Sequence, residues 1–199
     1  MPNSKRDYKV ALISKAQASI LLKKYHYLTE ISKGFKSGYN VGLFHGDNVE
    51  PVGACIFTGF PTPELAVGAF GLSRENQQGL WELSRLVLHP DNQSSEHNLA
   101  GWFIARAMRM LTKDQKVRAV LSYADDAYHS GTVYRATGFS YYGLTDKKKD
   151  FWIRQPDGSM VKHSRGPIAH LDGEWRARTQ KHRFMKVFDK SLNVKWIEQ

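Results

Sequence analysis

The fold is decided between residues 80 and 124 by three stretches, LWELSRLVL (80–88), LAGWFIARAMRML (99–111) and VRAVLSYA (117–124). The first and third are short and apolar with β-branched residues, which is typical of central strands, and the second has apolar residues at helical spacing. His89-Pro90-Asp91-Asn92 ends the first strand. A strand, a helix and a second strand in this order predict two neighbouring parallel strands joined by a right-handed crossover.

The preceding residues predict a helix and a hairpin. Ser14 can cap an amphipathic helix over residues 15–25, and apolar strands at 39–45 and 52–57 flank the turn residues Gly46-Asp47-Asn48. Pro61-Thr62-Pro63 then predicts a loop that runs to about residue 78.

The later residues complete one α+β domain, a mixed sheet flanked by helices. A short helix leads to Tyr134 and Gly138, a strand follows at 140–144, and strands at 151–154 and 159–162 form a second hairpin around Pro156-Asp157-Gly158. We predict a single domain over residues 1–199, in which 14–145 form the core. Residues 146–199 add the C-terminal hairpin and a basic segment with a tail, all packed on the core.

Composition narrows the class of protein. Lys and Arg number 29 against 19 Asp and Glu, which gives a net charge of +10, and 41% of the 199 residues are hydrophobic, enough to fill a core. Apolar stretches are short and broken by charge, so we expect no membrane segment, no signal peptide and a cytoplasmic protein. The single cysteine, Cys55, excludes an internal disulfide and a multi-cysteine zinc site.

The positive charge favours nucleic acid as the partner. Residues 146–199 hold thirteen Lys or Arg against seven Asp or Glu. Within this segment, we expect five cations to contact phosphates, with a solvated basic face as the alternative: Arg176, Arg178, Lys181, Arg183 and Lys186.

Three groups of residues are candidates for chemistry. Strand alternation places Glu82 and Ser84 on one face and Leu83 and Arg85 on the other. The charges of Glu82 and Arg85 in an apolar strand indicate a structural ion pair, a strand edge that reaches solvent, or a carboxylate and a guanidinium that line a cleft between two splayed strands. Two further candidates, Ser122 and Asp125, end the next parallel strand, where ligands bind in such sheets, although Asp125 can instead cap the following helix. A phenol, Tyr134, ends that helix four residues before Gly138.

The strand, helix and strand, followed by Tyr134-Arg135-Ala136-Thr137-Gly138-Phe139, resemble the core of the Gcn5-related N-acetyltransferases (GNAT). In that superfamily this tyrosine often protonates the departing thiolate, so the resemblance implies acetyl-coenzyme A as a donor held near Ser122, Tyr134 and Arg85. One departure is the stretch 89–101, which lacks the paired glycines of a pyrophosphate loop.

More specifically, five motifs together resemble the Mom family of bacteriophage DNA-modification proteins: Tyr25-His26-Tyr27, Glu82-Leu83-Ser84-Arg85-Leu86, Ser122-Tyr123-Ala124-Asp125, the Tyr134 motif and Lys181-His182-Arg183-Phe184. The resemblance implies transfer of a carbamoylmethyl group to adenine N6 in double-stranded DNA, which protects phage DNA from host restriction in the host cytoplasm. It places an active centre at His26, Tyr27, Arg85, Ser122, Asp125 and Tyr134, with Glu82 a lower-ranked member.

Carbamoylmethyl joins nitrogen to a methylene carbon, which ordinary acetyl transfer does not produce. The donor is therefore either an acetyl unit attacked at its methyl carbon or a glycine-derived unit, supplied as a small molecule or on a carrier. The resemblance also implies Fe(II) as a candidate cofactor, with His26, Tyr27 and Asp125 as ligands, and the alternative for His26 is a packed, hydrogen-bonded side chain.

Adenine N6 lies inside the base stack, so we expect the base to be flipped into a pocket and stacked on Tyr27, Tyr123 or Tyr134. In this hypothesis Asp125 or Glu82 deprotonates the amine, Arg85 neutralises charge on the donor, Ser122 positions the donor and Tyr134 donates a proton. Two alternatives are an acetyl-coenzyme A-dependent N-acetyltransferase of a small-molecule or protein amine, and a DNA-binding antirestriction protein without catalysis.

Overall fold

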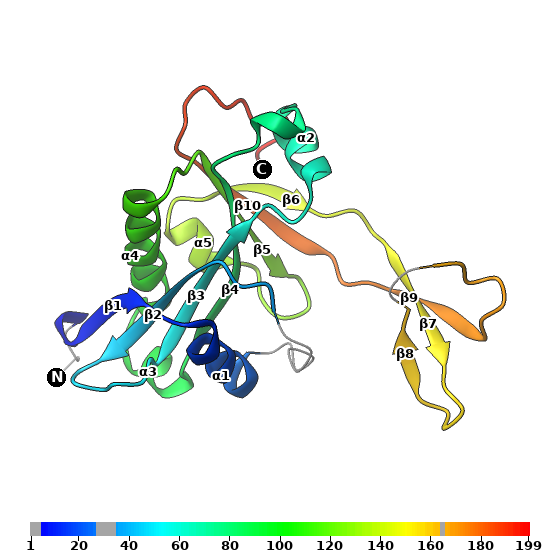
Figure 1. Ribbon diagram of the computed structural model, residues 1–199, viewed down its shortest axis with the longest axis horizontal. Helices are drawn as coiled ribbons and strands as arrows, with labels where there is room; N and C mark the ends of the chain where they lie inside the picture. Colours follow the sequence, from blue (N-terminus) through cyan, green and yellow to red (C-terminus); the bar gives the residue numbers. More distant parts are fainter. Residues whose placement is uncertain (1–4, 27–34, 164–165) are drawn as a thin grey trace.

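A computed structural model describes residues 5–26, 35–163 and 166–199. Seven strands form the main sheet in the order β1-β2-β3-β4-β5-β10-β6, and three form a smaller sheet in the order β8-β7-β9 (Figure 1). The strands of the main sheet are β1 (Tyr8–Leu12), β2 (Tyr39–His45), β3 (Gly53–Gly59), β4 (Leu80–Leu88), β5 (Ala119–Asp125), β6 (Ser140–Leu144) and β10 (Lys181–Val187). The helices are α1 (Lys15–Tyr25), α2 (Pro63–Phe70), α3 (Pro90–Ser95), α4 (Leu99–Asp114) and α5 (Thr132–Ala136), with short 3-10 turns at Lys5–Asp7 and Arg74–Asn76.

The predicted α+β architecture is confirmed. Within the described sheet β4 and β5 pair in parallel, joined through α3 and α4, and the other neighbouring strands pair antiparallel. The predicted hairpin of β2 and β3 forms as well, with Tyr39 opposite Phe57.

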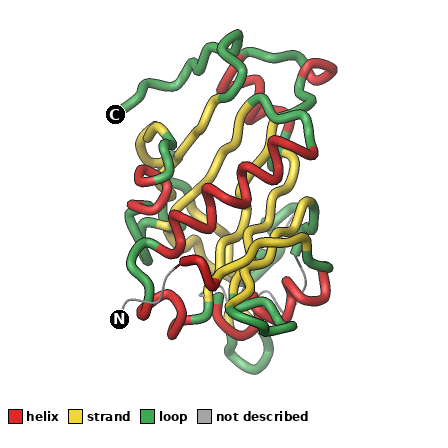
Figure 2. Tube along the Cα trace, turned by 90° about the vertical axis from the view of Figure 1, so that its left-hand side faces the viewer, coloured by secondary structure: helices red, strands yellow, loops and turns green. Residues whose placement is uncertain are grey.

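Helices cover both faces of the main sheet. On one face α4 crosses the strands diagonally (Figure 2) and buries Phe103, Ile104 and Leu111 against them. On the other face α1 buries Leu21 and Leu22 against Ile56 and Val87. A third cluster lies under α2, where Ala66 and Phe70 pack with Leu121 and Met185.

Helix α1 begins where the sequence predicts. The Ser14 hydroxyl accepts a hydrogen bond from the backbone N–H of Gln17, and the Gln17 side chain accepts one from the backbone N–H of Ser14, which completes a capping box.

The loop expected over residues 61–78 is wrong, because helix α2 occupies its first half. Thr62 accepts a hydrogen bond from the N–H of Leu65, Pro63 stands at the first helical position, and Gly71 ends the helix at φ 71°. The prolines that indicated a loop are therefore a helix start signal.

After β6 the chain leaves the main sheet and forms a three-stranded arm of β7 (Lys149–Arg154), β8 (Met160–Lys162) and β9 (Gly173–Ala177). The predicted second hairpin is β7 with β8, and β9 adds a strand on the other side of β7. The chain then returns as β10 between β5 and β6, and its tail packs Leu192, Val194 and Trp196 near α2. The expected division at residue 145 thus falls at the base of the arm, and the later residues contribute a strand to the core.

None of the helices in the described ranges is long and apolar enough to cross a membrane.

Candidate active site

The candidate site begins at the point where β4 and β5 stop pairing. Their parallel ladder runs from Leu80 opposite Ala119 to Leu83 opposite Ser122, whereas β4 continues to Leu88 and β5 to Asp125. The buried Ser122 hydroxyl donates a 3.0 Å hydrogen bond to the carbonyl of Leu83, which satisfies that carbonyl at the last pair of the ladder. Ser122 therefore holds the two strands together at the point where they separate.

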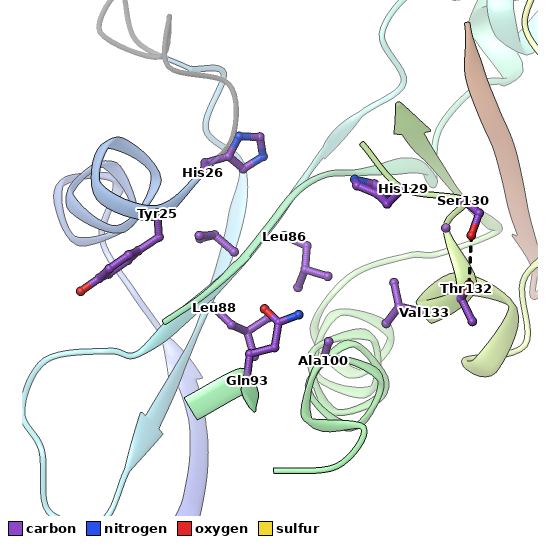
Figure 3. Close-up of a pocket in the computed structure, with 12 residues that line it drawn as sticks. Tyr25, His26, Leu86, Leu88, Gln93, Ala100, His129, Ser130, Thr132 and Val133 are labelled. Carbon is purple, nitrogen blue, oxygen red and sulfur yellow. Dashed lines mark hydrogen bonds between the residues drawn. The ribbon is translucent and has the colours of Figure 1, made fainter. Parts of the chain in front are cut away.

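A cleft of about 390 Å³ opens beyond this point (Figure 3). One wall is the second half of β4, Leu86 to Leu88, and the other is the loop and first turn of α5, His129 to Val133, with Gln93 and Ala100 between them. His26, at the end of α1, and His129 lie at the same end of the cleft, one from each side.

Burial lowers the pKa of both histidines below that of a free imidazole. Burial lowers the pKa of His26 to about 4, and the charge of Arg85 and the His129 ring add to the effect. Burial also lowers the pKa of His129, with Asp125 acting in the opposite direction and His182 adding to the lowering. Neutral imidazoles offer a nitrogen lone pair to a proton or a metal ion.

A β-bulge changes the faces of β4. Ile56 pairs with Arg85 and Phe57 with Leu83, so Ser84 is an extra residue in β4, and its hydroxyl bonds the Ile56 carbonyl at 3.1 Å. The alternation that placed Arg85 on the Leu83 face is therefore wrong, because an inserted residue reverses the faces of everything after it. As a result, Glu82, Ser84 and Arg85 border the same cavity of about 270 Å³.

Glu82 and Arg85 carry opposite charges in this cavity. Burial raises the pKa of Glu82, and the charges of Arg85, Lys181 and Lys36 oppose the rise. Arg85 donates to the carbonyl of Ser84, while its buried Nε has no hydrogen-bond partner among the described residues. A carboxylate with a raised pKa can exchange a proton, and the guanidinium beside it can bind an anion.

A larger cavity of about 520 Å³ adjoins Glu82 near the base of the arm. It is lined by Tyr123 of β5, by the start of α2, by the carboxylates of Glu82 and Asp146, and by four cationic side chains: Lys148, Arg178, Lys181 and Arg183. Burial raises the pKa of Tyr123 to about 12, with Glu82 adding to the rise and Arg183 opposing it. The Tyr123 side chain is therefore a neutral phenol in a basic cavity.

Three described residues predicted for the site from the sequence, Ser122, Asp125 and Tyr134, line none of these three cavities, and Ser122 is fully buried. Asp125 is 8% exposed, and its two oxygens accept hydrogen bonds from the N–H of Ala127 and the hydroxyl of Thr179. Tyr134 is 5% exposed, its ring within 6 Å of those of Phe139 and Phe184. Another predicted residue, Tyr27, lies outside the described residues.

The five predicted DNA-binding cations do not form one group in the structure. Arg178, Lys181 and Arg183 meet at the large cavity. By contrast, Arg176 lies on β9, paired with Glu174, and Lys186 bonds the carbonyl of Thr137, on the opposite face of β10 from Lys181 and Arg183.

Sequence reasoning missed His129 and Lys148. His129 follows the polar turn at Asp125-Asp126, the position where loops at strand ends carry site residues, and Lys148 stands in the run Lys147-Lys148-Lys149. Those two signals were available in the sequence.

Among the described residues, which exclude Tyr27, no three side chains of His, Cys, Asp or Glu are grouped closely enough to hold a metal ion. The residues at the start of α4 fit a coenzyme A diphosphate only in part. Asn98 makes no side-chain cap there, which leaves the first-turn amides for an anion, but the buried carboxylate of Glu96 lies just before the helix.

The parted sheet with its cleft is the fold of the GNAT acetyltransferases. An acetyltransferase of Bacillus subtilis in complex with CoA superposes with a TM-score of 0.52 at 9% identity over 91% of this chain and 99% of that one. The ribosomal-protein-S18-alanine N-acetyltransferase of Escherichia coli gives 0.53 at 12% identity over 92% and 94%. The sequence profile of the Mom protein family matches residues 7–196, and the chain belongs to this family. No curated protein sequence matches it significantly.

Proposed function

We propose that this protein transfers a carbamoylmethyl group to N6 of adenine in duplex DNA. The observation that carries the proposal is the position of Glu82, which borders a cavity lined by four cations and stands on the strand that forms the wall of the cleft. Four cations suit a phosphate-bearing acceptor, and membership of the Mom family supports DNA as that acceptor.

In this proposal the donor lies in the cleft and the extruded adenine in the large cavity. The two spaces are linked along β4 by the cavity of about 270 Å³: Glu82 borders both this cavity and the large one, Arg85 borders this cavity, and the next residue, Leu86, borders the cleft. The reacting carbon and nitrogen meet at the bulge.

Glu82 accepts the proton that N6 loses when it bonds the methylene carbon of a carbamoylmethyl donor. The bond from that carbon to the donor's leaving group breaks, its electron pair departs with the leaving group, and Arg85 offsets the negative charge that this group gains. We favour Glu82 over Asp125 as the base because both oxygens of Asp125 already accept hydrogen bonds within the fold. Tyr123 supplies the stacking surface for the base, Ser122 fixes the point where β4 and β5 separate, and Lys181 and Arg183 hold phosphates.

Mass spectrometry of nucleosides from DNA of cells that express the protein tests the proposal. We expect carbamoylmethyl-deoxyadenosine with the wild type and its loss with Glu82→Gln. The control is Glu75→Gln, an exposed carboxylate that borders none of the three cavities, and we expect it to keep the product. Absence of any modified deoxyadenosine with soluble wild-type protein would contradict the proposal.

The second candidate is an acetyl-coenzyme A-dependent N-acetyltransferase, which the fold of the CoA-bound Bacillus subtilis enzyme favours. Calorimetry with acetyl-coenzyme A separates the two. Tight binding without any DNA product supports the second candidate, whereas a DNA product shows the first whichever donor binds.

A further inference from the structure

The arm of β7, β8 and β9 stands away from the body (Figure 1), and its two faces differ in charge. Residues that pair across two strands share a face, and successive residues of one strand lie on opposite faces. One face carries most of the apolar side chains of the arm: Phe151, Ile153, Val161 and Trp175. The other, which we call the cationic face, carries five Lys or Arg side chains: Lys148, Arg154, Lys162, Arg176 and Arg178.

The carboxylates of the cationic face leave its surface positive. The side chain of Asp150 is only 13% exposed and pairs with both Arg178 and Lys162, which are each 46% exposed. Hydrogen bonds from Arg178 and Lys162 lower the pKa of Asp150 to about 2, so the carboxylate stays ionised and holds both cations. With Asp172 and Glu174, the face has three carboxylates against five cations, a net charge of +2. A recessed anion beneath exposed cations presents positive charge to a partner.

An aromatic ring lies in the middle strand of this face. Trp152 is directly opposite Lys162 of β8 and Glu174 of β9, and the guanidinium of Arg176 lies 5.1 Å from the centre of its ring. Arg176 donates from Nε to Glu174 at 2.7 Å, whereas its two Nη groups have no hydrogen-bond partner among the described residues. The Trp152 ring and Glu174 therefore hold a guanidinium whose remaining donors can bind a phosphate.

The cationic face is continuous with the large cavity. Lys148 and Arg178, at the base of the arm, belong to both. From Lys148 to Arg154 the strand advances by about 20 Å, which is the rise of about six base pairs of a duplex. A duplex that presents one base to the large cavity can therefore lie along the cationic face.

Resting on the proposed function, we propose that the cationic face of the arm binds the DNA duplex on one side of the extruded adenine. Arg176, Lys162 and Arg154 contact backbone phosphates beyond those held at the large cavity, and the apolar face is turned away from the duplex. The positive charge selects a polyanion, and the length of the charged track suits an extended one rather than a nucleotide or a single phosphate.

Fluorescence anisotropy with a labelled duplex of about 20 base pairs, over a range of salt concentrations, tests the proposal. We expect Arg176→Gln to lower the slope of log K against log salt by about 0.9, the share of one phosphate contact. Arg176→Lys keeps the charge and most of the slope, which separates loss of charge from loss of the fold.

Lys149→Gln is the matched control. Lys149 is an exposed cation of the same arm, but it lies opposite Ala177 on the apolar face. Its substitution removes one charge, as Arg176→Gln does, and we expect it to leave the salt slope nearly unchanged. The same slope for Arg176→Gln and Lys149→Gln overturns the proposal, and so does a wild type that does not bind duplex DNA.

Nucleoside mass spectrometry on the same variants distinguishes this failure from failure of the proposed function. If the wild type modifies no adenine but Arg176→Gln still lowers the salt slope, the cationic face binds DNA and the proposed function fails. If the wild type modifies adenine and Arg176→Gln binds DNA like Lys149→Gln, the role of the cationic face alone fails.

Discussion

Glu82 is the residue on which the proposed chemistry depends. Among the described residues it is the one carboxylate that borders both the large cavity of about 520 Å³ and the cavity of about 270 Å³ next to the bulge of β4. We expect Glu82→Gln to lower the rate of adenine modification by a factor of about 100 or more, the usual contribution of a general base. The fraction of modified deoxyadenosine in DNA from expressing cells measures it, and an unchanged fraction assigns the proton to another group.

The same substitution has a pH-dependent effect on stability. Because the folded state raises the pKa of Glu82, the protonated form is favoured by folding, and stability is lost as the pH rises through the folded pKa. A neutral glutamine avoids the burial of charge. We therefore expect Glu82→Gln to have a higher Tm than the wild type at pH 7 and the same Tm at pH 4, measured by calorimetry. A lower Tm at both values would show that the carboxylate is stabilised by its neighbours.

Ser122 has a structural task that can be separated from chemistry. Ser122→Ala leaves the buried carbonyl of Leu83 without its donor, and we expect a loss of about 1–3 kcal/mol in the free energy of unfolding. Ser84→Ala removes a similar hydroxyl at a half-buried position, so its smaller loss is the control. Urea denaturation compares them, and equal losses would argue against a special role for the last pair of the ladder.

At the scale of elements, Gly131 fixes how α5 meets the sheet. It has φ +73°, and a Cβ atom there would lie 2.3 Å from the Phe184 ring. Gly158 has a similar φ of +83° with nothing within 4 Å of an added Cβ. We expect Gly131→Ala to cost about 2–5 kcal/mol, from strain and overpacking together, and Gly158→Ala about 1 kcal/mol, from strain alone. Equal costs in urea denaturation would mean that Phe184 moves aside freely.

The elements that the sequence predicted correctly are those whose signals are local. The capping box at Ser14, the turn between β2 and β3 and the apolar periodicity of α4 each lie within one short segment. Helix α2 was missed because a proline such as Pro63 is compatible with two structures: it interrupts a helix or strand when it lies inside one, and it is favoured at the first position of a helix. Thr62 distinguishes the two only once its hydrogen bond from the N–H of Leu65 is known.

The site was less predictable because its geometry is not local. One inserted residue, Ser84, reverses the faces of β4, and alternation cannot reveal an insertion. The grouping of Lys148 with Lys181 depends on the chain leaving the sheet after β6 and returning as β10. Asp125 and Tyr134 stand out in the sequence, yet their side chains are packed into the fold.

At the scale of the whole molecule, the effect of the net charge of +10 on DNA binding depends on where the cations lie. We compare two pairs of exposed cations, each neutralised to glutamine: Lys148 with Lys181 at the large cavity, and Arg109 with Lys113 on α4, which covers the opposite face of the sheet. Both variants lose two charges. If Lys148 and Lys181 contact phosphates, their loss lowers the slope of log K against log salt by about 2, while the α4 pair leaves it nearly unchanged.

Duplex binding over a range of salt concentrations measures both slopes. Equal slopes for the two variants would mean that the protein attracts DNA by its overall charge. That result would contradict the proposal that the large cavity binds the acceptor. Unequal slopes would locate the duplex on the side of the sheet where Glu82 and the base of the arm lie, which is the side from which an extruded base can reach the bulge of β4.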